Sequence, residues 1–467
     1  MMEPSTHMAG DDERPPSRLS GNLLAAALVV IVVLAPLPLG GNRPFLWPAW
    51  TFLVGITATA YAAYLLMRRR GLAVPLASFA WPGFVFAAIC GYLLVQCLPI
   101  ARVLGLGQIG PPPGIETPFL SIAPGQTVLM LVRWLGYGLL FLLAAQVSAS
   151  RSRAILMVEA VYFALVFYGL LGLVQLGFFG DTLLGLNKWA YNGFATGTFV
   201  NRNSYATYLA FGLAIGTALL TTGLVPSGTE PQRRGWLQKR GTIGLYLASL
   251  GVILAALFAS GSRMGLFAGL LGSAVVFGLA LFRRERSTQA SFLVPIAGLA
   301  GGLLILVAFG GALLDRVSGI ENDAESRLEL YRQVWAMTLQ RPFTGFGGGA
   351  FELAFQMFRG PPLGNDVVWD KAHSTYLTLA AELGLPVALL ALALVGGLSA
   401  RVTTLLRNPN GGRRIALAVT GVLVVAATHS LVDFSLEIQA NAYLFVMLLG
   451  IGFGYAQTVP RHTTGSP

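Results

Sequence analysis

The stretch TIGLYLASLGVILAALFASGSRMGLFAGLLGSAVVFGLALF (242–282) contains two apolar runs of about twenty residues, separated by a short turn with one arginine. A helix of that length can cross the hydrocarbon core of a bilayer. Similar runs recur along nearly the whole chain, which is 55% hydrophobic and only 11% charged. The runs are solidly apolar rather than alternating, which argues against a β-barrel. The sequence therefore predicts an all-α polytopic membrane protein.

Twelve transmembrane helices are predicted, at 22–40, 47–67, 75–98, 127–147, 154–179, 203–224, 242–260, 264–282, 291–313, 374–398, 415–432 and 439–457. The first run is kept as a span because no small-residue cleavage site of a signal peptide follows it. The predicted organisation is a tail at 1–20, transmembrane helices one to nine at 21–313, a lid loop at 314–373, transmembrane helices ten to twelve at 374–457, and a tail at 458–467.

The net charge of +11 comes largely from basic clusters in short loops, near residues 68–70, 151–153, 233–240, 283–286 and 401–414. With both termini in the cytoplasm, all of these clusters lie on the cytoplasmic side, as the positive-inside rule requires. The charge therefore indicates membrane topology, and no nucleic-acid partner is expected. Cys90 and Cys97 fall within one predicted helix, about 10 Å apart along its axis, so they are expected to pack rather than form a disulfide.

Twelve lysines and arginines do not follow this charge rule and need another explanation. They are Arg43, Arg102, Arg133, Lys188, Arg202, Arg263, Arg316, Arg327, Arg332, Arg341, Arg359 and Lys371. Most of them lie in three outward-facing places: the connection GTFVNRNSYATY (197–208), the turn ASGSRMG (259–265) and the lid loop.

The lid loop is too long and too varied in composition to be a simple linker. In SRLELYRQVWAMTLQ (326–340), Leu328, Tyr331, Trp335 and Leu339 recur at helical spacing. Pro342 is expected to end that helix, GFGGGAF (345–351) to turn the chain, and ELAFQMF to form a second short helix. We expect these amphipathic helices to lie on the outer face of the membrane.

Arg263 stands between two apolar helices, in a turn too short to leave the membrane surface. Its planar guanidinium is suited to clamp a phosphate, although it could instead extend to lipid headgroups. Arg202, between Asn201 and Asn203 at the start of a predicted helix, is a second anion-binding candidate because the helix dipole favours negative charge there. Arg327 and Arg332 are five residues apart on the lid helix, so they face different directions and one of them could be solvated.

His373 precedes the tenth predicted helix and could accept a proton from a hydroxyl; a structural hydrogen bond is the alternative. Asp370 could orient its ring or could cap the following helix. His429 and Asp433 are four residues apart and are expected to share a helix face, as a second functional pair or as a structural one. Glu159 and Glu382 fall inside spans, where a carboxyl group needs a partner.

No cofactor or metal is expected from these residues. GFGGG is not followed by Lys-Ser or Lys-Thr, so it is not a nucleotide-binding P-loop, and no Cys/His cluster or acidic pair in an outer loop indicates a metal site. In glycosyl transfer, fixed cations can neutralise a leaving phosphate in place of a metal.

Four stretches together resemble the O-antigen ligase and polymerase family: NRNSYATYLA (201–210), GSRMGLFAG (261–269), RPFTGFGGGAF (341–351) and HSTYLTLAAELGLPVALL (373–390). The opening GGNRPFLWPAW and the late HSLVDFSLEIQANAYLF are similar to members from exopolysaccharide gene clusters. The resemblance is most specific between about residues 195 and 390.

The resemblance implies a GT-C-like glycosyltransferase of the bacterial inner membrane that takes a glycan from an undecaprenyl-pyrophosphate carrier on the periplasmic face. Lipid A-core would be the acceptor of a ligase, and a carrier-linked glycan that of a polymerase. The family's histidine falls on His373 and its pyrophosphate-binding arginines on Arg263, Arg202 and Arg327. Inverting, metal-independent transfer is expected, with membrane lipids as surroundings.

Two other classes remain open. A transporter would place ionisable residues near the bilayer midplane, and Glu159 and Arg133 are the residues that fit that description. A structural scaffold for polysaccharide assembly would leave Arg263 and His373 without a role.

Overall fold

The computed structural model describes residues 16–109, 114–183, 185–224, 236–281, 320–364, 368–408 and 412–459. Within these ranges it is built of long helices and two small antiparallel strand pairs, β1 (Gln108–Ile109) with β2 (Ile115–Glu116) and β3 (Thr182–Leu183) with β4 (Leu186–Asn187). The predicted ninth helix at 291–313 and Arg316 lie outside the described residues.

Nine helical segments in the described ranges are long and apolar enough to span a membrane. They correspond to α2 (Leu46–Met67), η2 with α3 (Leu76–Gln96), α4 (Pro124–Val147), α5 (Arg151–Phe178), α6 (Arg202–Leu224), most of α7 (Trp236–Ser260), α8 (Arg263–Leu281), α13 with η3 (Leu385–Arg407) and α15 (Gln439–Thr458). Two shorter helices, α1 (Arg18–Leu34) and α14 (Arg413–His429), occupy the first and eleventh predicted spans. The all-α polytopic membrane fold is confirmed.

The tenth predicted span, at 374–398, is not one helix. It is divided into α12 (Thr375–Leu383) and α13 (Leu385–Thr403) at Gly384, which has a φ of 76°. A Cβ at Gly384 would lie 2.5 Å from the carbonyl oxygen of Phe343, so both the backbone conformation and the close contact require glycine. The predicted span is therefore divided into two helices, and the part that is long and apolar enough to cross a membrane begins at Leu385.

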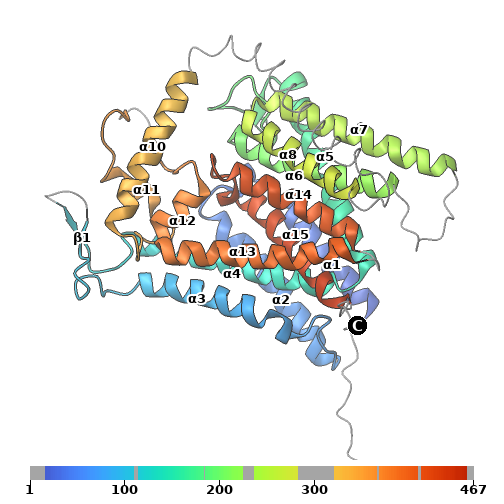
Figure 1. Cartoon of the computed structure of the whole chain (residues 1–467), viewed down its shortest axis with the longest axis horizontal. Coiled ribbons are helices and arrows are strands. Elements are labelled where there is room, and N and C mark those ends of the chain that lie inside the picture. The colour runs from blue at the N-terminus through green and yellow to red at the C-terminus, as the bar shows by residue number, and fades with distance from the viewer. Residues whose placement is uncertain are drawn as a thin grey trace, which may run out of the picture.

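The long helices run side by side, and α6 and α15 are buried along nearly their whole length (Figure 1). Small residues allow α8 to approach α6: a Cβ at Gly265 would lie 2.4 Å from the Cβ of Ala206, and one at Gly269 would lie 3.2 Å from that of Ala210. Glycine and alanine at four-residue spacing are typical of close packing between membrane helices. This contact brings the N-termini of α6 and α8 together.

The two predicted helices of the lid loop are present as α10 (Ile320–Gln340) and α11 (Phe351–Gln356). Figure 1 shows α10 beside one end of α3, α4 and α13, running across their direction. Its buried hydrophobic residues are Leu330, Val334 and Met337, whereas Leu328, Trp335 and Leu339 are exposed. The helix was predicted correctly. Of the four residues used to predict it, Leu328, Trp335 and Leu339 are exposed, and Tyr331 is directed toward the protein.

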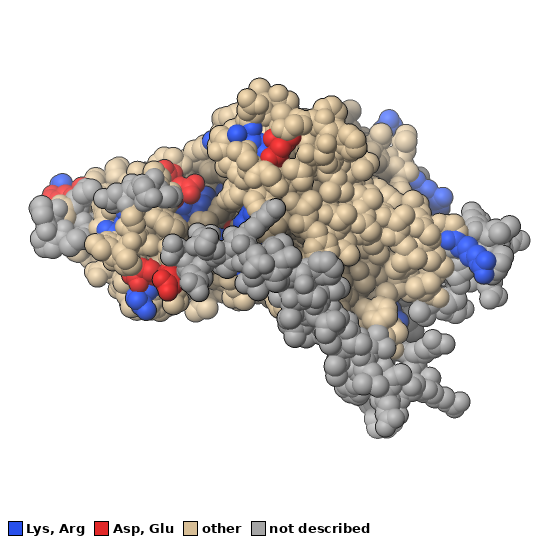
Figure 2. All heavy atoms as spheres, turned by 90° about the horizontal axis from the view of Figure 1, so that it is seen from above, with Lys and Arg blue, Asp and Glu red and all other residues tan. Residues whose placement is uncertain are grey.

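The two ends of the bundle differ in charge. We call the end where α6, α8 and α12 begin the site end, and the opposite end the far end. In Figure 2 most of the visible middle surface lacks charged side chains, blue and red atoms lie together toward α10, and only blue atoms are visible at the far end. On this face, the visible charged side chains are thus concentrated toward the two ends of the helices.

Candidate active site at the starts of three helices

The start of α6 is fixed by Asn201. Its side-chain oxygen accepts hydrogen bonds from the backbone N–H groups of Asn203 (2.7 Å) and Ser204 (3.3 Å), and its amide nitrogen donates to the hydroxyl of Tyr191 (3.2 Å). Because asparagine caps the helix in this way, Arg202 becomes its first residue. Asn203 contributes to the cap through its backbone.

The Arg202 guanidinium lies over two aromatic rings, 4.2 Å from the ring centre of Phe194 and 5.7 Å from that of Tyr191. Its Nη1 is also close to the turn between α7 and α8, since a Cβ at Gly261 would lie 3.2 Å from that atom. Arg202 is therefore packed between the rings and this turn, at the N-terminus of α6.

Arg263 is the first residue of α8, and Ser262 caps that helix by accepting a hydrogen bond from the N–H of Gly265 (3.2 Å). The Arg263 guanidinium has no hydrogen-bond or ion-pair partner in the part of the chain that the structure describes. A positive charge at a helix N-terminus is opposed by the helix dipole. The structure thus places two arginines, Arg202 and Arg263, at neighbouring helix ends that themselves favour an anion.

His373 immediately precedes the third helix start, where Ser374 caps α12. Its backbone is in the left-handed region, with a φ of 49°, and its carbonyl oxygen accepts a hydrogen bond from the hydroxyl of Tyr331 in α10 (2.8 Å). Its imidazole lies between the rings of Trp369 and Phe434, with centroid distances of 6.1 and 5.1 Å. A histidine held in this uncommon conformation is fixed by its surroundings.

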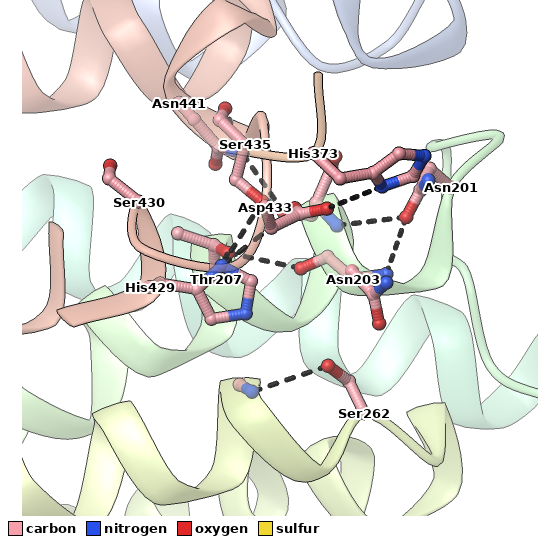
Figure 3. Close-up of polar contacts among 12 residues, drawn as sticks. Asn201, Asn203, Thr207, Ser262, His373, His429, Ser430, Asp433, Ser435 and Asn441 are labelled. Atoms are coloured by element: carbon pink, nitrogen blue, oxygen red, sulfur yellow. Dashed lines mark hydrogen bonds and ion pairs between the residues drawn. The ribbon is translucent and has the colours of Figure 1, made fainter. Parts of the chain in front are cut away.

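Asp433 lies between two histidines (Figure 3). One carboxylate oxygen is 4.0 Å from Nδ1 of His373, and the other is 3.7 Å from Nδ1 of His429 and accepts a hydrogen bond from Ser435. The hydroxyl of Thr207 is 3.0 Å from the same His429 nitrogen. Asp433 and His429 are both almost completely buried, whereas 21% of the His373 side chain is exposed. Only His373 can therefore meet an incoming ligand directly.

The charge states of this pair follow from burial and from two neighbouring cations. Burial, with Arg327 and Lys371 nearby, lowers the pKa of His373 to about 4. Burial raises the pKa of Asp433 to about 6, although Ser435 and Arg327 oppose that shift. At neutral pH the imidazole is therefore neutral, as a proton acceptor must be, and the carboxylate is ionised.

The two lid arginines differ in their surroundings. The charge of Arg327 acts on Tyr191, Tyr331, His373 and Asp433, so it belongs to the electrostatic environment of the site. The side chain of Arg332 is 72% exposed and forms an ion pair with Glu329 (2.8 Å). The expectation that the two face different directions is met, and Arg332 is the solvated one.

Two expectations about partners differ from the structure. Asp370 is exposed, and the carboxylate paired with His373 is that of Asp433; Ser374, not Asp370, caps α12. The predicted shared helix face of His429 and Asp433 is also wrong, because α14 ends at His429. The turn after the helix brings Asp433 back to His429.

Other cations that do not follow the charge rule have structural partners. Arg341 donates to the carbonyl oxygen of Leu120 (2.9 Å), Lys188 pairs with Asp181, and Arg102 forms an exposed pair with Glu116. Arg133 is buried, with its Nε donating to the side-chain oxygen of Gln439 (2.9 Å). Their unusual positions are thus explained by the fold.

Glu159, which is half-buried, and Glu382, which is buried, both have partners. Glu159 accepts a hydrogen bond from Arg414 (3.1 Å), and Glu382 accepts one from the backbone N–H of Phe351 at the start of α11 (3.2 Å). Both contacts are structural.

Sequence reasoning missed the aromatic residues of the site. Tyr191, which has a φ of 57°, holds Asn201 and Arg202, while Trp369 and Phe434 flank His373. Trp369 is four residues before the histidine, so an aromatic residue beside a candidate base was an available signal. Phe434 directly follows Asp433, and Tyr191 lies ten residues before Asn201. The sequence did not show that their rings would contact His373 and Arg202.

Residues 248–392 match a family model described as O-antigen ligase. No curated protein matches the chain. The matched region contains Arg263, Arg327 and His373, and it excludes Arg202 and Asp433, which the structure brings to the same place.

Proposed function

We propose that this chain, which belongs to the O-antigen ligase and polymerase family, transfers a glycan from an undecaprenyl-pyrophosphate carrier to a sugar hydroxyl at the periplasmic face of the bacterial inner membrane. The observation that supports this most is the arrangement of Arg202 and Arg263 at adjacent helix N-termini, with the partly exposed His373 beside the buried Asp433 at the third helix start. The first part suits an anion, and the second suits removal of a proton.

Arg263, Arg202 and Arg327 would hold the pyrophosphate. Fixed cations and helix N-termini stabilise the transition state most where negative charge develops on the leaving group as its bond breaks. Arg263 has no partner among the described residues, so it can bind a ligand without breaking a contact to any of them. Arg332 is solvated and is not needed in this arrangement.

His373 would accept the proton of the acceptor hydroxyl. The acceptor oxygen then forms a bond to the anomeric carbon from the face opposite the carrier, and the bond between that carbon and the pyrophosphate oxygen breaks with inversion. The carrier leaves as undecaprenyl pyrophosphate with one additional negative charge, and the proton remains on His373. Asp433 stabilises the resulting imidazolium, with His429 and Ser435 holding the carboxylate in place.

The orientation rests on the positive-inside rule. The basic clusters, including Arg151, Arg153, Arg401, Arg413 and Arg414, lie at or next to the far end of helices α4, α5, α13 and α14. Placing that end in the cytoplasm puts His373 in the periplasm and both termini in the cytoplasm.

Polymerisation of carrier-linked repeat units is the alternative within the family, since both reactions use the same donor.

The transporter hypothesis is weakened because its two ionisable residues have structural partners: Glu159 pairs with Arg414, and Arg133 binds Gln439.

The proposal is tested with purified protein in nanodiscs and an undecaprenyl-pyrophosphate-linked glycan, with and without lipid A-core. Glycosylated lipid A-core with release of the carrier would identify a ligase, and lengthening chains without lipid A-core a polymerase. His373→Ala serves as the inactive control. No transfer and no carrier release by wild-type protein under either condition would overturn the proposal.

A further inference from the structure

His373 is held by contacts on both sides of its strained backbone. The residues that hold it belong to the connection between α14 and α15, at 430–437. On its C-terminal side, the N–H of Thr375 donates to the carbonyl oxygen of Ser430 (3.0 Å), and the Thr375 hydroxyl donates to the carbonyl oxygen of Asp433 (3.3 Å). The segment that carries the imidazole is therefore fastened to the segment that carries its carboxylate partner.

On its N-terminal side, the contact is an ion pair. Nζ of Lys371 is 3.2 Å from a carboxylate oxygen of Glu437, and only 23% and 12% of the two side chains are exposed. Glu437 is fixed in turn, because Arg133 from α4 donates hydrogen bonds to its carbonyl oxygen and to the side chain of Gln439. The pair thus connects the loop before His373 to the body of the helix bundle.

A largely buried ion pair is costly to break on one side only, because the remaining charge loses its partner while it stays desolvated. The negative charges of Glu382 and Asp370 also favour the protonated form of Lys371, whereas the positive charge of Arg133 disfavours it. The left-handed conformation of a residue other than glycine is disfavoured unless its neighbours enforce it. Removal of the contact would therefore let residues 371–373 relax toward ordinary backbone angles and turn the imidazole away from Asp433.

We propose that the Lys371–Glu437 ion pair is a positioning contact that keeps the His373 imidazole against Asp433. Lys371 and Glu437 act through His373 rather than on the substrate. The positioning of His373 can be measured without any substrate, and its consequence for transfer rests on the proposed function.

The experiment follows the chemical reactivity of His373. The chain has four histidines; His7 and His462 are replaced by Gln, and His429 is only 1% exposed. The purified protein is treated with diethyl pyrocarbonate near neutral pH, and modification of His373 is followed by mass spectrometry. Lys371→Met and Glu437→Gln are compared with Lys371→Arg, which keeps the charge.

The matched control is another ion pair that is exposed. Arg102 and Glu116 are 3.7 Å apart, with 69% and 63% of their side chains exposed, so Arg102→Met removes a cation without a buried contact. Thermal unfolding of every variant identifies any that has lost the folded state.

The expected result is a several-fold faster modification of His373 in Lys371→Met, a smaller increase in Glu437→Gln, and the wild-type rate in Lys371→Arg and Arg102→Met. Transfer by Lys371→Met should fall in kcat by roughly 10- to 100-fold, because small displacements of a catalytic group have large effects, with the donor KM little changed. An unchanged modification rate in folded Lys371→Met would overturn the positioning role. Faster modification, in a protein whose wild-type form transfers no glycan, would support the positioning role and reject the proposed function.

Discussion

Arginine has opposite roles at the two ends of the helix bundle. At the far end, arginines bind carbonyl oxygens where helices finish: Arg153 donates to Val147 (3.1 Å), Arg413 to Leu279 and Ala280 (both 2.7 Å), and Arg401 to Ala456. A cation at a helix C-terminus is stabilised by the dipole and by the unpaired carbonyl groups. These arginines are thus satisfied by the fold.

At the site end, Arg202 and Arg263 stand where helices begin, and there the dipole opposes them. Such positions favour an external anion, which would interact with the guanidinium group and with the helix N-terminus together. The difference teaches that a membrane arginine is best interpreted by the helix end that its guanidinium reaches. Arg153 and Arg413 also lie in the first turns of their own helices, but they bind the C-terminal carbonyl groups of neighbouring helices. Burial alone would not separate the two groups.

The largest effect is expected from Arg263→Ala and His373→Ala. Loss of a fixed cation at the leaving group costs on the order of 10²–10³ in kcat, and loss of a general base costs roughly 10²–10⁴. Both variants should insert and fold normally, which gel filtration of the purified protein would show. If either folded variant transferred glycan at the wild-type rate, the assignment of the active site to this end of the bundle would be wrong.

A smaller loss, about 10- to 100-fold, is expected from Arg263→Lys. Lysine keeps the charge, but it cannot offer two parallel N–H groups to a phosphate. Arg413→Lys at the far end is the matched control and should retain wild-type kcat. Equal activity of Arg263→Lys and wild type would show that charge alone is sufficient at the site end.

The pH dependence should show that Asp433 is part of the site. Its pKa is raised to about 6, so the ionised carboxylate is present above that pH and is lost as the pH falls through it. Only the ionised carboxylate can stabilise the imidazolium that forms on His373 during the reaction. The kcat of the wild type should therefore decrease below about pH 6. In Asp433→Asn, kcat at neutral pH should be lower. The decrease near pH 6 should disappear, leaving only the decrease at lower pH that protonation of His373 causes. If the pH dependence of kcat in Asp433→Asn were the same as in the wild type, Asp433 would have no role in the reaction.

The smallest effect on activity is expected at the far end. Arg413→Ala removes hydrogen bonds to two carbonyl groups at the end of α8, and such contacts contribute about 0.3–1 kcal/mol. The melting temperature should fall by about 1–4 °C. The kcat should stay within about twofold of the wild type, because the activation free energy is not expected to change by as much as the roughly 1.4 kcal/mol that a tenfold change in rate requires. A large loss of transfer without loss of stability would show that the far end also takes part in catalysis.

The sequence by itself determined the membrane fold and the candidate cations. Apolar runs predict spanning helices because a bilayer requires both the length and the internal hydrogen bonding of a helix. Arg263, Arg202 and His373 could be selected because each is a polar residue at the boundary of an apolar run. The break at Gly384 had a local signal in Gly384-Leu385-Pro386, because glycine permits the positive φ and proline can occupy the first turn of the following helix.

Only the tertiary structure decided which partners these residues have. Asp370 is close to His373 in sequence, yet Asp433, sixty residues later, provides the carboxylate. The lid helix carries apolar residues on two faces, and packing buries Val334 while leaving Trp335 exposed. Periodicity identifies a helix and its faces, but it contains no information on the distant segment that will cover a face. That choice depends on contacts between segments far apart in the chain, which form only when the helices pack.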